Sequence, residues 1–342
     1  MLPSGRRHVD KVRFRPGGTM QGFNSELFLT TTEVGDLLDV HPSTVKRWSD
    51  SGELRTKKTD GGHRRIYLRD VMSFAKERGV PTYLTPFAPY ESHVWLAVRD
   101  AVRHDDFDRI VSLSMGWLVR GYPRRITALL RELGSRPDLS LARLCDRAVR
   151  PLMTQVGTAW REGRLRIGEE HMASQAAMEA LICLSQGSGP QAMLTPSRNG
   201  DGSHRVAVVG AMEGDHHHLG AMCARVLLEQ AGWTVFYLGA DTPAEEFAAI
   251  QRAQGASLIC VSFSPPGSAA HMRRCLDVLR EFYRSHLPYD LVFGGVSSET
   301  FEPGRVSTPF RSFEIIPSME SFLEWGRNRT EDEGGDLWRK LG

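Results

Sequence analysis

The sequence predicts a multidomain α plus α/β protein, and three observations support that class. Residues 26–80 combine two short amphipathic helices with a Gly-rich hairpin. Residues 92–187 repeat apolar side chains every three or four positions, which is the period of helices that bury one face. Residues 204–327 alternate short apolar runs with amphipathic helices, a pattern typical of a parallel sheet covered by helices on both faces.

Charge is unevenly distributed along the 342 residues. Residues 1–80 contain 15 Lys and Arg against 10 Asp and Glu, whereas the remainder contains 28 against 31. A basic segment joined to a mildly acidic body indicates that the N-terminal part meets a polyanion. Residues 1–25, rich in Gly, Pro and Arg, are expected to form a disordered arm, and residues 328–342 a flexible tail.

Composition favours a cytoplasmic protein without a membrane partner. No apolar run reaches the roughly 18–20 residues that span a bilayer, and the basic N-terminus lacks the apolar core of a secretory signal. The five cysteines are scattered without metal-site spacing, which is typical of reduced thiols. If the basic segment binds DNA, the protein would be associated with the nucleoid.

Residues 29–54, LTTTEVGDLLDVHPSTVKRWSDSGEL, predict a helix, a tight turn and a second helix. A threonine of the run Thr30–Thr32 is expected to cap the first helix, with Glu33 near its first turn. Ser43 is expected to cap the second helix, which turns Val45 and Trp48 inward. In a recognition helix, the exposed N-terminal half meets base edges and phosphates. The candidate DNA-binding residues there are Ser43, Thr44, Lys46 and Arg47.

The next segment, KKTDGGHRRIYLRDV, predicts a hairpin that serves as a wing. Gly61 and Gly62 permit a tight turn, and His63, Arg64 and Arg65 place donors at its tip for the phosphate backbone. With T-V-K-R-W and the glycine after it, residues 27–79 resemble the MerR-type winged helix-turn-helix. The resemblance implies a self-assembled dimer or larger oligomer on a double-stranded DNA operator. A small helical domain with a solvated basic face is the alternative.

Helical periodicity from about Ser92 to Gln186 predicts a bundle of four or five helices. Breaks are expected near Asp105–Asp108, Gly121–Pro123 and Gly134–Pro137. The bundle is flanked by two segments rich in Pro, Ser or Gly, residues 85–92 and 187–203, which are expected to be linkers.

The last part of the chain predicts five buried strands, which favour a flavodoxin-like doubly wound parallel sheet. The strands are expected at residues 205–212, 233–240, 257–264, 290–295 and 313–318. Helices are expected at residues 219–232, 243–255 and 271–286. Ligands of such sheets bind beyond the carboxyl ends of the strands, so residues at those ends can line one site.

Three motifs follow strands of this sheet. Asp215, His217 and Gly220 form D-x-H-x-x-G after the first strand, Ser262–Ser264 end the third, and Gly294–Gly295 end the fourth. Over residues 204–325, this pattern resembles the cobalamin-binding domain shared by methionine synthase and several mutases. The family's Leu after S-x is Ser264 here, and Pro265 and Pro266 follow it.

This resemblance implies that His217 is the lower axial ligand of cobalt, in place of the cofactor's own benzimidazole. Neutral imidazole is a good cobalt ligand, and Asp215 can accept the other ring N–H. The displaced nucleotide tail would enter a slot at Gly220, Ser262, Gly294 and Gly295, beside Ser264. Two alternatives are open: His216–His218 could be an adventitious metal-binding tract, or Asp215 and His217 a hydrolytic base pair, although no nucleophile elbow accompanies them.

A second group of candidate residues lies in the bundle, in GTAWREGRLRIGEEHMAS. This segment resembles the helical cap of methionine synthase and of CarH-type light-responsive regulators. The resemblance implies that Trp160 covers the upper face of the corrin, with Glu170 and His171 close by. Some CarH-type proteins have a His after this Trp; because Arg161 stands there, that position cannot supply an upper imidazole after illumination. An ordinary core tryptophan is the alternative.

The order of winged helix, cap and cobalamin domain is that of CarH-type regulators over essentially the whole chain, which implies a regulator rather than an enzyme. We expect a repressor that binds DNA as an oligomer, dimer or tetramer, assembled by cobalamin. Adenosylcobalamin is the expected form and methylcobalamin the second, and light would release DNA by cleaving the cobalt–carbon bond. The alternatives are a light-independent cobalamin sensor, a corrinoid protein serving a methyltransferase, and a DNA-binding protein with an empty domain.

Overall fold

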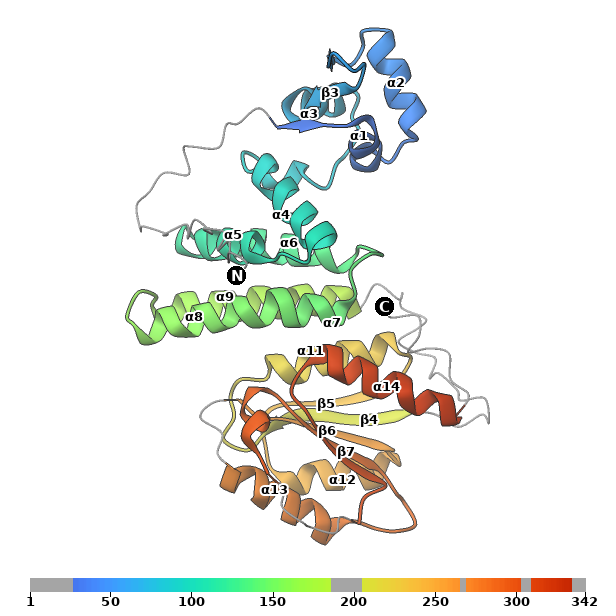
Figure 1. Cartoon of the computed structure of the whole chain (residues 1–342). Helices are drawn as coiled ribbons and strands as arrows, with labels where there is room; N and C mark the ends of the chain where they lie inside the picture. The colour runs from blue at the N-terminus through green and yellow to red at the C-terminus, as the bar shows by residue number, and fades with distance from the viewer. Residues whose placement is uncertain (1–26, 186–204, 265–268, 303–308, 334–342) are drawn as a thin grey trace, which may run out of the picture. The chain divides into compact units, whose positions relative to one another are not determined.

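The computed structural model describes residues 27–185, 205–264, 269–302 and 309–333 (Figure 1). The chain divides into two compact units, Met1–Thr85 and Pro86–Gly342. The predicted arm at residues 1–25 and the predicted linker at residues 187–203 lie outside the described residues, as do Pro265 and Pro266. None of the helices within the described ranges is both long and apolar enough to cross a membrane.

The first unit contains the predicted helix-turn-helix and wing. Its helices are α1 (Thr31–Leu38), α2 (Pro42–Asp50) and α3 (Leu68–Glu77). Its antiparallel sheet has the order β1 (Phe28–Leu29), β3 (Arg64–Tyr67), β2 (Lys57–Lys58). A buried apolar core holds them together, and it includes Val34, Leu38, Val45, Ile66 and Val71.

One of the two predicted helix caps in this unit is confirmed, and the other is wrong. Thr30 caps α1 as expected: its hydroxyl accepts the Glu33 N–H at 3.2 Å, while the Glu33 carboxylate accepts the Thr30 N–H at 2.9 Å. The expectation that Ser43 caps α2 was wrong. His41 is the cap, and its Nδ1 accepts the Ser43 N–H at 3.2 Å. The helix starts earlier because Pro42 has no N–H to satisfy and its fixed φ suits the first helical position.

The second unit begins with a helical bundle. Its helices are α4 (Glu91–His104), α5 (Asp108–Val119), α6 (Pro123–Gly134), α7 (Leu141–Leu144), α8 (Arg150–Arg161) and α9 (Ile167–Ser185). A π-turn, Cys145–Val149, joins α7 to α8 without interrupting the chain direction. The predicted breaks are confirmed, but the segment expected to be a linker contains a 3₁₀ turn (Thr85–Phe87). Phe87 is buried and stacks on Trp117, with ring centroids 5.8 Å apart, which holds this segment against the bundle.

A five-stranded parallel sheet completes the second unit (Figure 1). Its strands are β4 (Val206–Met212), β5 (Thr234–Thr242), β6 (Leu258–Ser262), β7 (Asp290–Gly294) and β8 (Ser312–Ile316). The order β5-β4-β6-β7-β8 is the predicted flavodoxin-like order. The strands are apolar along most of their length because helices cover both faces.

The helices of the sheet region form two layers. One face carries α11 (Leu219–Gln230) and α14 (Met319–Glu333), and the other carries α12 (Ala244–Gln254) and α13 (Ala269–Phe282) (Figure 1). The α12–α13 side buries a cluster that includes Val208, Phe247, Ile259, Leu276 and Phe293. On the other side, α9 of the bundle packs along α11. Helix α14 continues to Glu333, so part of the predicted tail is helical, whereas residues 334–342 lie outside the described residues.

Replacing Thr30 by Ala tests the α1 cap. We expect the first-turn amides of α1 to exchange with solvent about fivefold faster, because an N-cap contributes about 1 kcal/mol. Hydrogen exchange followed by mass spectrometry measures this. Thr32→Ala, at an exposed position in the same turn, is the matched control and should exchange like the wild type. Equal rates in the two variants would contradict the assignment of the cap.

Candidate functional site

The loop after β4 is tied to the loop after β6 by one carboxylate. Asp215, whose side chain is 9% exposed, accepts the His217 N–H with Oδ1 at 2.8 Å and the Ser264 N–H with Oδ2 at 2.6 Å. The Ser264 hydroxyl donates in turn to the His217 carbonyl at 3.2 Å. The structure therefore brings together three of the sequence-predicted residues, and Ser264 adds a contact that a leucine there could not make.

A second aspartate anchors the same loop to the end of β5. Asp241 accepts the Gly214 N–H at 2.7 Å, and its own N–H donates to the Asp215 carbonyl at 3.0 Å. Its φ of 51° places it in the left-handed region, which Asp tolerates better than most residues. The loop is thus fixed from both neighbouring strands, which is the pre-organisation that a ligand-binding side chain requires.

His217 projects from this fixed loop into solvent. Its side chain is 67% exposed, and its Nδ1 lies 3.5 Å from Asp215 Oδ1. A carboxylate beside Nδ1 favours the tautomer with the proton there, which leaves the lone pair of Nε2 available to a metal. Within the described part of the chain, no three His, Cys, Asp or Glu side chains gather into a metal site.

Sequence reasoning missed the contact that holds the next residue. His218 Nδ1 lies 2.9 Å from Tyr237 Oη, and the phenol also donates to the His218 carbonyl at 3.2 Å. Burial raises the pKa of Tyr237 to about 12, so the phenol keeps its proton at neutral pH. His216 is exposed, so the three consecutive histidines have three different surroundings. Spacing alone cannot separate them, because Tyr237 comes from the neighbouring strand β5.

A pocket opens between α11, α14 and the carboxyl ends of the strands. Its cavity volume is about 20 Å³, and it is lined by Gly220, Ser262, Gly294 and Gly295 together with Ile316, Met319 and Phe322, among others. A Cβ on Gly220 would lie 3.0 Å from the Ser262 hydroxyl, and one on Gly294 would lie 3.1 Å from the Ile316 carbonyl. These glycines keep the mouth of the pocket open. The sequence predicted them but missed the wall formed by β8 and α14.

Gly295 also has a conformational reason to be glycine. Its φ is 91°, and a Cβ there would lie 2.4 Å from the Phe263 carbonyl oxygen. Any side chain would therefore push β7 away from the end of β6, next to the pocket. Gly295 is therefore required for the close approach of two backbone segments.

The candidate residues of the bundle lie where α8 ends and α9 begins. Trp160 is 47% exposed, and two neighbours on α9 are also exposed, Ile167 at 60% and Met172 at 37%. The Glu170 carboxylate accepts the Ser174 hydroxyl at 2.7 Å and lies 3.6 Å from His171 Nε2. The side chain of Arg161 folds back on its own helix, onto Thr158 at 3.2 Å. Trp160 is therefore a surface residue rather than an ordinary core tryptophan.

The first unit presents the predicted DNA-facing residues with one notable pairing. Ser43, Lys46 and Arg47 of α2 are exposed, as are His63 and Arg65 of the wing, while Thr44 is half-buried. Arg64 is only 21% exposed, and its guanidinium binds the Asp50 carboxylate at the end of α2 at 2.6 Å. This hydrogen bond lowers the pKa of Asp50. Arg64 therefore joins the wing to the second helix.

Comparisons with protein families match three parts of the chain. Residues 28–79 match a helix-turn-helix domain, and residues 117–185 and 205–305 each match a B12 (cobalamin) binding domain. The last match contains Asp215, His217 and the pocket glycines, and the middle one contains Trp160, Glu170 and His171. The chain thus combines a helix-turn-helix with two B12 binding domains.

Curated relatives fall into two groups. A corrinoid protein of Desulfitobacterium hafniense is 27% identical over 176 residues, which cover 52% of this chain and 79% of that protein. The HTH-type transcriptional repressor CarA of Myxococcus xanthus is 30% identical over 160 residues, 45% of this chain and 47% of the repressor. The repressor CarH of the same organism is 27% identical over 166 residues, 48% and 51% respectively. The match spans about half the length of these two repressors.

Replacing Asp215 by Ala tests the tie between the two loops. We expect the His217 and Ser264 amides to exchange at least tenfold faster, because each loses a hydrogen bond to a charged acceptor. Hydrogen exchange measures both amides without any ligand. Glu213→Ala, which removes an exposed carboxylate from the same loop, should leave them unchanged. Unchanged protection of Ser264 in the Asp215 variant would contradict the tie.

Proposed function

We propose that this chain is a cobalamin-dependent transcriptional repressor that binds an operator as an oligomer. The observation that carries the proposal is His217, exposed on a loop that Asp215 and Asp241 fix, three residues before Gly220 of an apolar pocket, in a chain that also has a helix-turn-helix. The similarity to two HTH-type repressors supports the regulatory role. The B12 domain matches support the cofactor.

The residues present fit cobalamin in three respects. His217 offers one imidazole nitrogen, which is enough when a corrin ring supplies the remaining equatorial ligands. Asp215 Oδ1 lies 3.5 Å from the imidazole Nδ1 and can orient the ring. The pocket at Gly220 and Gly294 has an apolar lining and lies at the strand ends, where the displaced nucleotide tail would enter. When bound, the cofactor would supply a cobalt–carbon bond that light can break.

Trp160 and its neighbours are proposed to cover the upper face of the cofactor. Trp160, Ile167 and Met172 are exposed apolar side chains that binding would remove from water. Glu170 and His171 can donate or accept hydrogen bonds at its edge. Such a cover suits adenosylcobalamin, with methylcobalamin as the smaller alternative. Because Arg161 follows Trp160, no imidazole at that position replaces the upper ligand after illumination.

Oligomer assembly would convert cofactor binding into control of DNA binding. Linked DNA-binding units bind repeated sites much more tightly than one unit does, so separating the protomers lowers affinity without changing a DNA contact. In this account, Lys46 and Arg47 meet the major groove and the wing meets the phosphates. Ser43, Thr44 and His63 are proposed to contribute further contacts.

A corrinoid protein serving a methyltransferase is the second candidate function. The corrinoid protein of Desulfitobacterium hafniense, 79% of which aligns with this chain, favours it. The helix-turn-helix match at residues 28–79 favours the repressor, because a methyl carrier has no use for a DNA-reading unit. Sequence-selective DNA binding by the cofactor-loaded protein distinguishes the two functions, and methyl transfer without such binding would favour the carrier.

Replacing His217 by Ala tests the metal ligand. We expect cobalamin to bind at least tenfold more weakly and to keep its own base on cobalt, because the variant lacks the proposed axial imidazole. An absorbance titration in darkness reports both effects. His216→Ala removes the exposed neighbouring imidazole and should bind within twofold of the wild type. Equal affinity of the two variants would sink the assignment.

The two wing arginines should behave differently. Arg65→Ala is expected to reduce the slope of log affinity against log salt by about 1, as loss of one phosphate contact predicts. Arg64→Ala should weaken binding and also increase exchange of the wing amides, because it breaks the pair with Asp50. The DNA is an operator selected from a random pool by the cofactor-loaded protein. Unchanged wing exchange in Arg64→Ala would show that the pair does not position the wing.

Replacing Trp160 by Ala tests the cover and the light response. With adenosylcobalamin in darkness, the wild type is expected to elute from gel filtration as an oligomer, and green light should return it to a smaller species with weaker operator binding. Trp160→Ala should assemble poorly even in darkness. Val119→Ala, a change at an equally exposed apolar position of α5, is the control. A wild type that assembles identically in light and darkness would leave only a light-independent sensor.

A further inference from the structure

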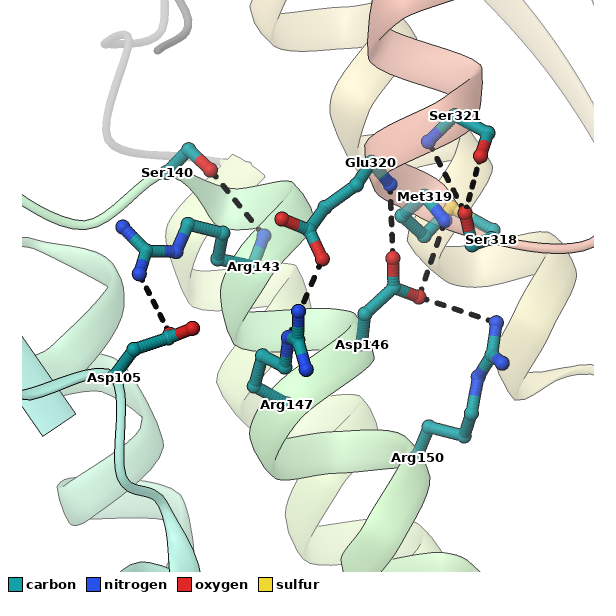
Figure 2. A network of polar contacts seen from close by, with 10 residues as sticks. All are labelled: Asp105, Ser140, Arg143, Asp146, Arg147, Arg150, Ser318, Met319, Glu320 and Ser321. Carbon is teal, nitrogen blue, oxygen red and sulfur yellow. Dashed lines mark hydrogen bonds and ion pairs between the residues drawn. The ribbon is translucent and has the colours of Figure 1, made fainter. Parts of the chain in front are cut away.

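The junction between bundle and sheet contains a helix cap supplied by a distant part of the chain. Asp146, in the π-turn between α7 and α8, accepts the Met319 N–H at 3.1 Å and the Glu320 N–H at 2.9 Å (Figure 2). These are the first two amides of α14, which packs beside the sheet. Helix N-terminal amides have no partner within their own helix, so Asp146 supplies what α14 lacks.

Local sequence satisfies only the next amides of α14. The Ser318 hydroxyl accepts the Ser321 N–H at 3.1 Å, and the Ser318 carbonyl accepts the Phe322 N–H at 3.0 Å. The N–H groups of the first turn of α14 are thus satisfied by two residues: Ser318, which directly precedes the helix, and Asp146 of the bundle. A carboxylate at this end of a helix also gains from the helix dipole.

The Asp146 carboxylate is held in place by Arg150, four residues further along the chain. Asp146 is 9% exposed, and the Arg150 guanidinium lies 3.3 Å from it and also donates to the Pro317 carbonyl. Arg147 lies 3.5 Å from the Glu320 carboxylate (Figure 2). A nearly buried charge with backbone donors on one side and arginine on the other is costly to leave unpaired. Separating the bundle from α14 would therefore leave both the Asp146 carboxylate and the first amides of α14 without their hydrogen-bond partners.

The same turn of α14 forms a wall of the pocket at the sheet edge. Met319, whose N–H binds Asp146, lines the pocket together with Phe322 and Ile316. Gly220 and Gly294 also line that pocket. Met319 thus connects the two regions: its backbone N–H binds Asp146 of the bundle, and its side chain lies where a bound tail would make contact.

We propose that Asp146 is a positioning residue that couples occupation of the pocket by the nucleotide tail to the placement of the bundle. The proposal rests on the cobalamin-binding function proposed above and adds a route of coupling that does not pass through Trp160. A tail in the pocket packs against Met319 and Phe322 and so fixes the first turn of α14. The fixed turn keeps its two amides directed at Asp146, and the bundle stays docked.

The test compares Asp146→Ala with the wild type, using cobalamin and cobinamide, a corrinoid without the nucleotide tail. We expect Asp146→Ala to weaken cobalamin binding by about 5-fold or more, within the roughly 2- to 30-fold range that loss of a helix cap produces. Cobinamide, which leaves the pocket empty, should bind within twofold of the wild type. Hydrogen exchange of the cofactor-free protein should show faster exchange at residues 319–320.

Two further variants complete the design. Asp105→Asn removes a carboxylate that pairs at 2.6 Å with Arg143, one turn from Asp146 but within the bundle, and should change neither affinity (Figure 2). Its φ of 55° is a conformation that Asn accepts well. Asp146→Asn keeps the shape and one acceptor, so an intermediate loss is expected even if Asp146→Ala folds poorly.

The outcomes separate this proposal from the function on which it rests. Unchanged cobalamin affinity, or an equal loss for cobalamin and cobinamide, overturns the coupling while leaving cobalamin binding intact. Unchanged exchange at residues 319–320 overturns the cap itself. A wild type that binds neither corrinoid overturns the proposed function and the coupling together.

Discussion

The site depends on the two backbone hydrogen bonds that the Asp215 carboxylate accepts. By accepting the N–H groups of His217 and Ser264, it joins the ends of the two central strands and leaves one imidazole facing solvent. In a parallel sheet of this order, the loops after β4 and β6 lie close together at the same edge. The Asp215 carboxylate then fixes their positions relative to each other. Asp241, at the end of β5, holds the same loop by accepting the Gly214 N–H. The imidazole is therefore positioned before any ligand arrives, and a ligand does not have to order the loop when it binds.

Each functional part of the chain shows this use of a charged side chain to hold an element from a distance. In the first unit, Arg64 and Asp50 join the wing to α2, the two elements that are proposed to meet DNA. In the second unit, Asp146 joins the bundle to α14. Regulation in such a molecule would act on how rigid parts associate rather than on the chemistry of any single contact. Avidity then converts a change of assembly into a change of DNA affinity.

The sequence predicted what is local or periodic. Alternating apolar runs predicted the five strands and their order, and the Thr30–Glu33 capping box predicted where α1 begins. It failed where the partner is far along the chain or where two residues compete. Pro42 shifted the α2 cap from Ser43 to His41, and a run of three histidines could not reveal which one Tyr237 would hold. The contacts of Asp146 with α14, more than 170 residues away, depend on how the bundle meets the sheet, which no spacing rule contains.

The most direct test of the account is whether the imidazole of His217 binds cobalt. The protein labelled with ¹⁵N-histidine and loaded with cob(II)alamin reports this in its electron paramagnetic resonance spectrum, because the axial nitrogen splits the cobalt lines. The account predicts doublets from a ¹⁵N ligand in the wild type, and their loss in His217→Ala. Triplets from the cofactor's own ¹⁴N base in the wild type would contradict it.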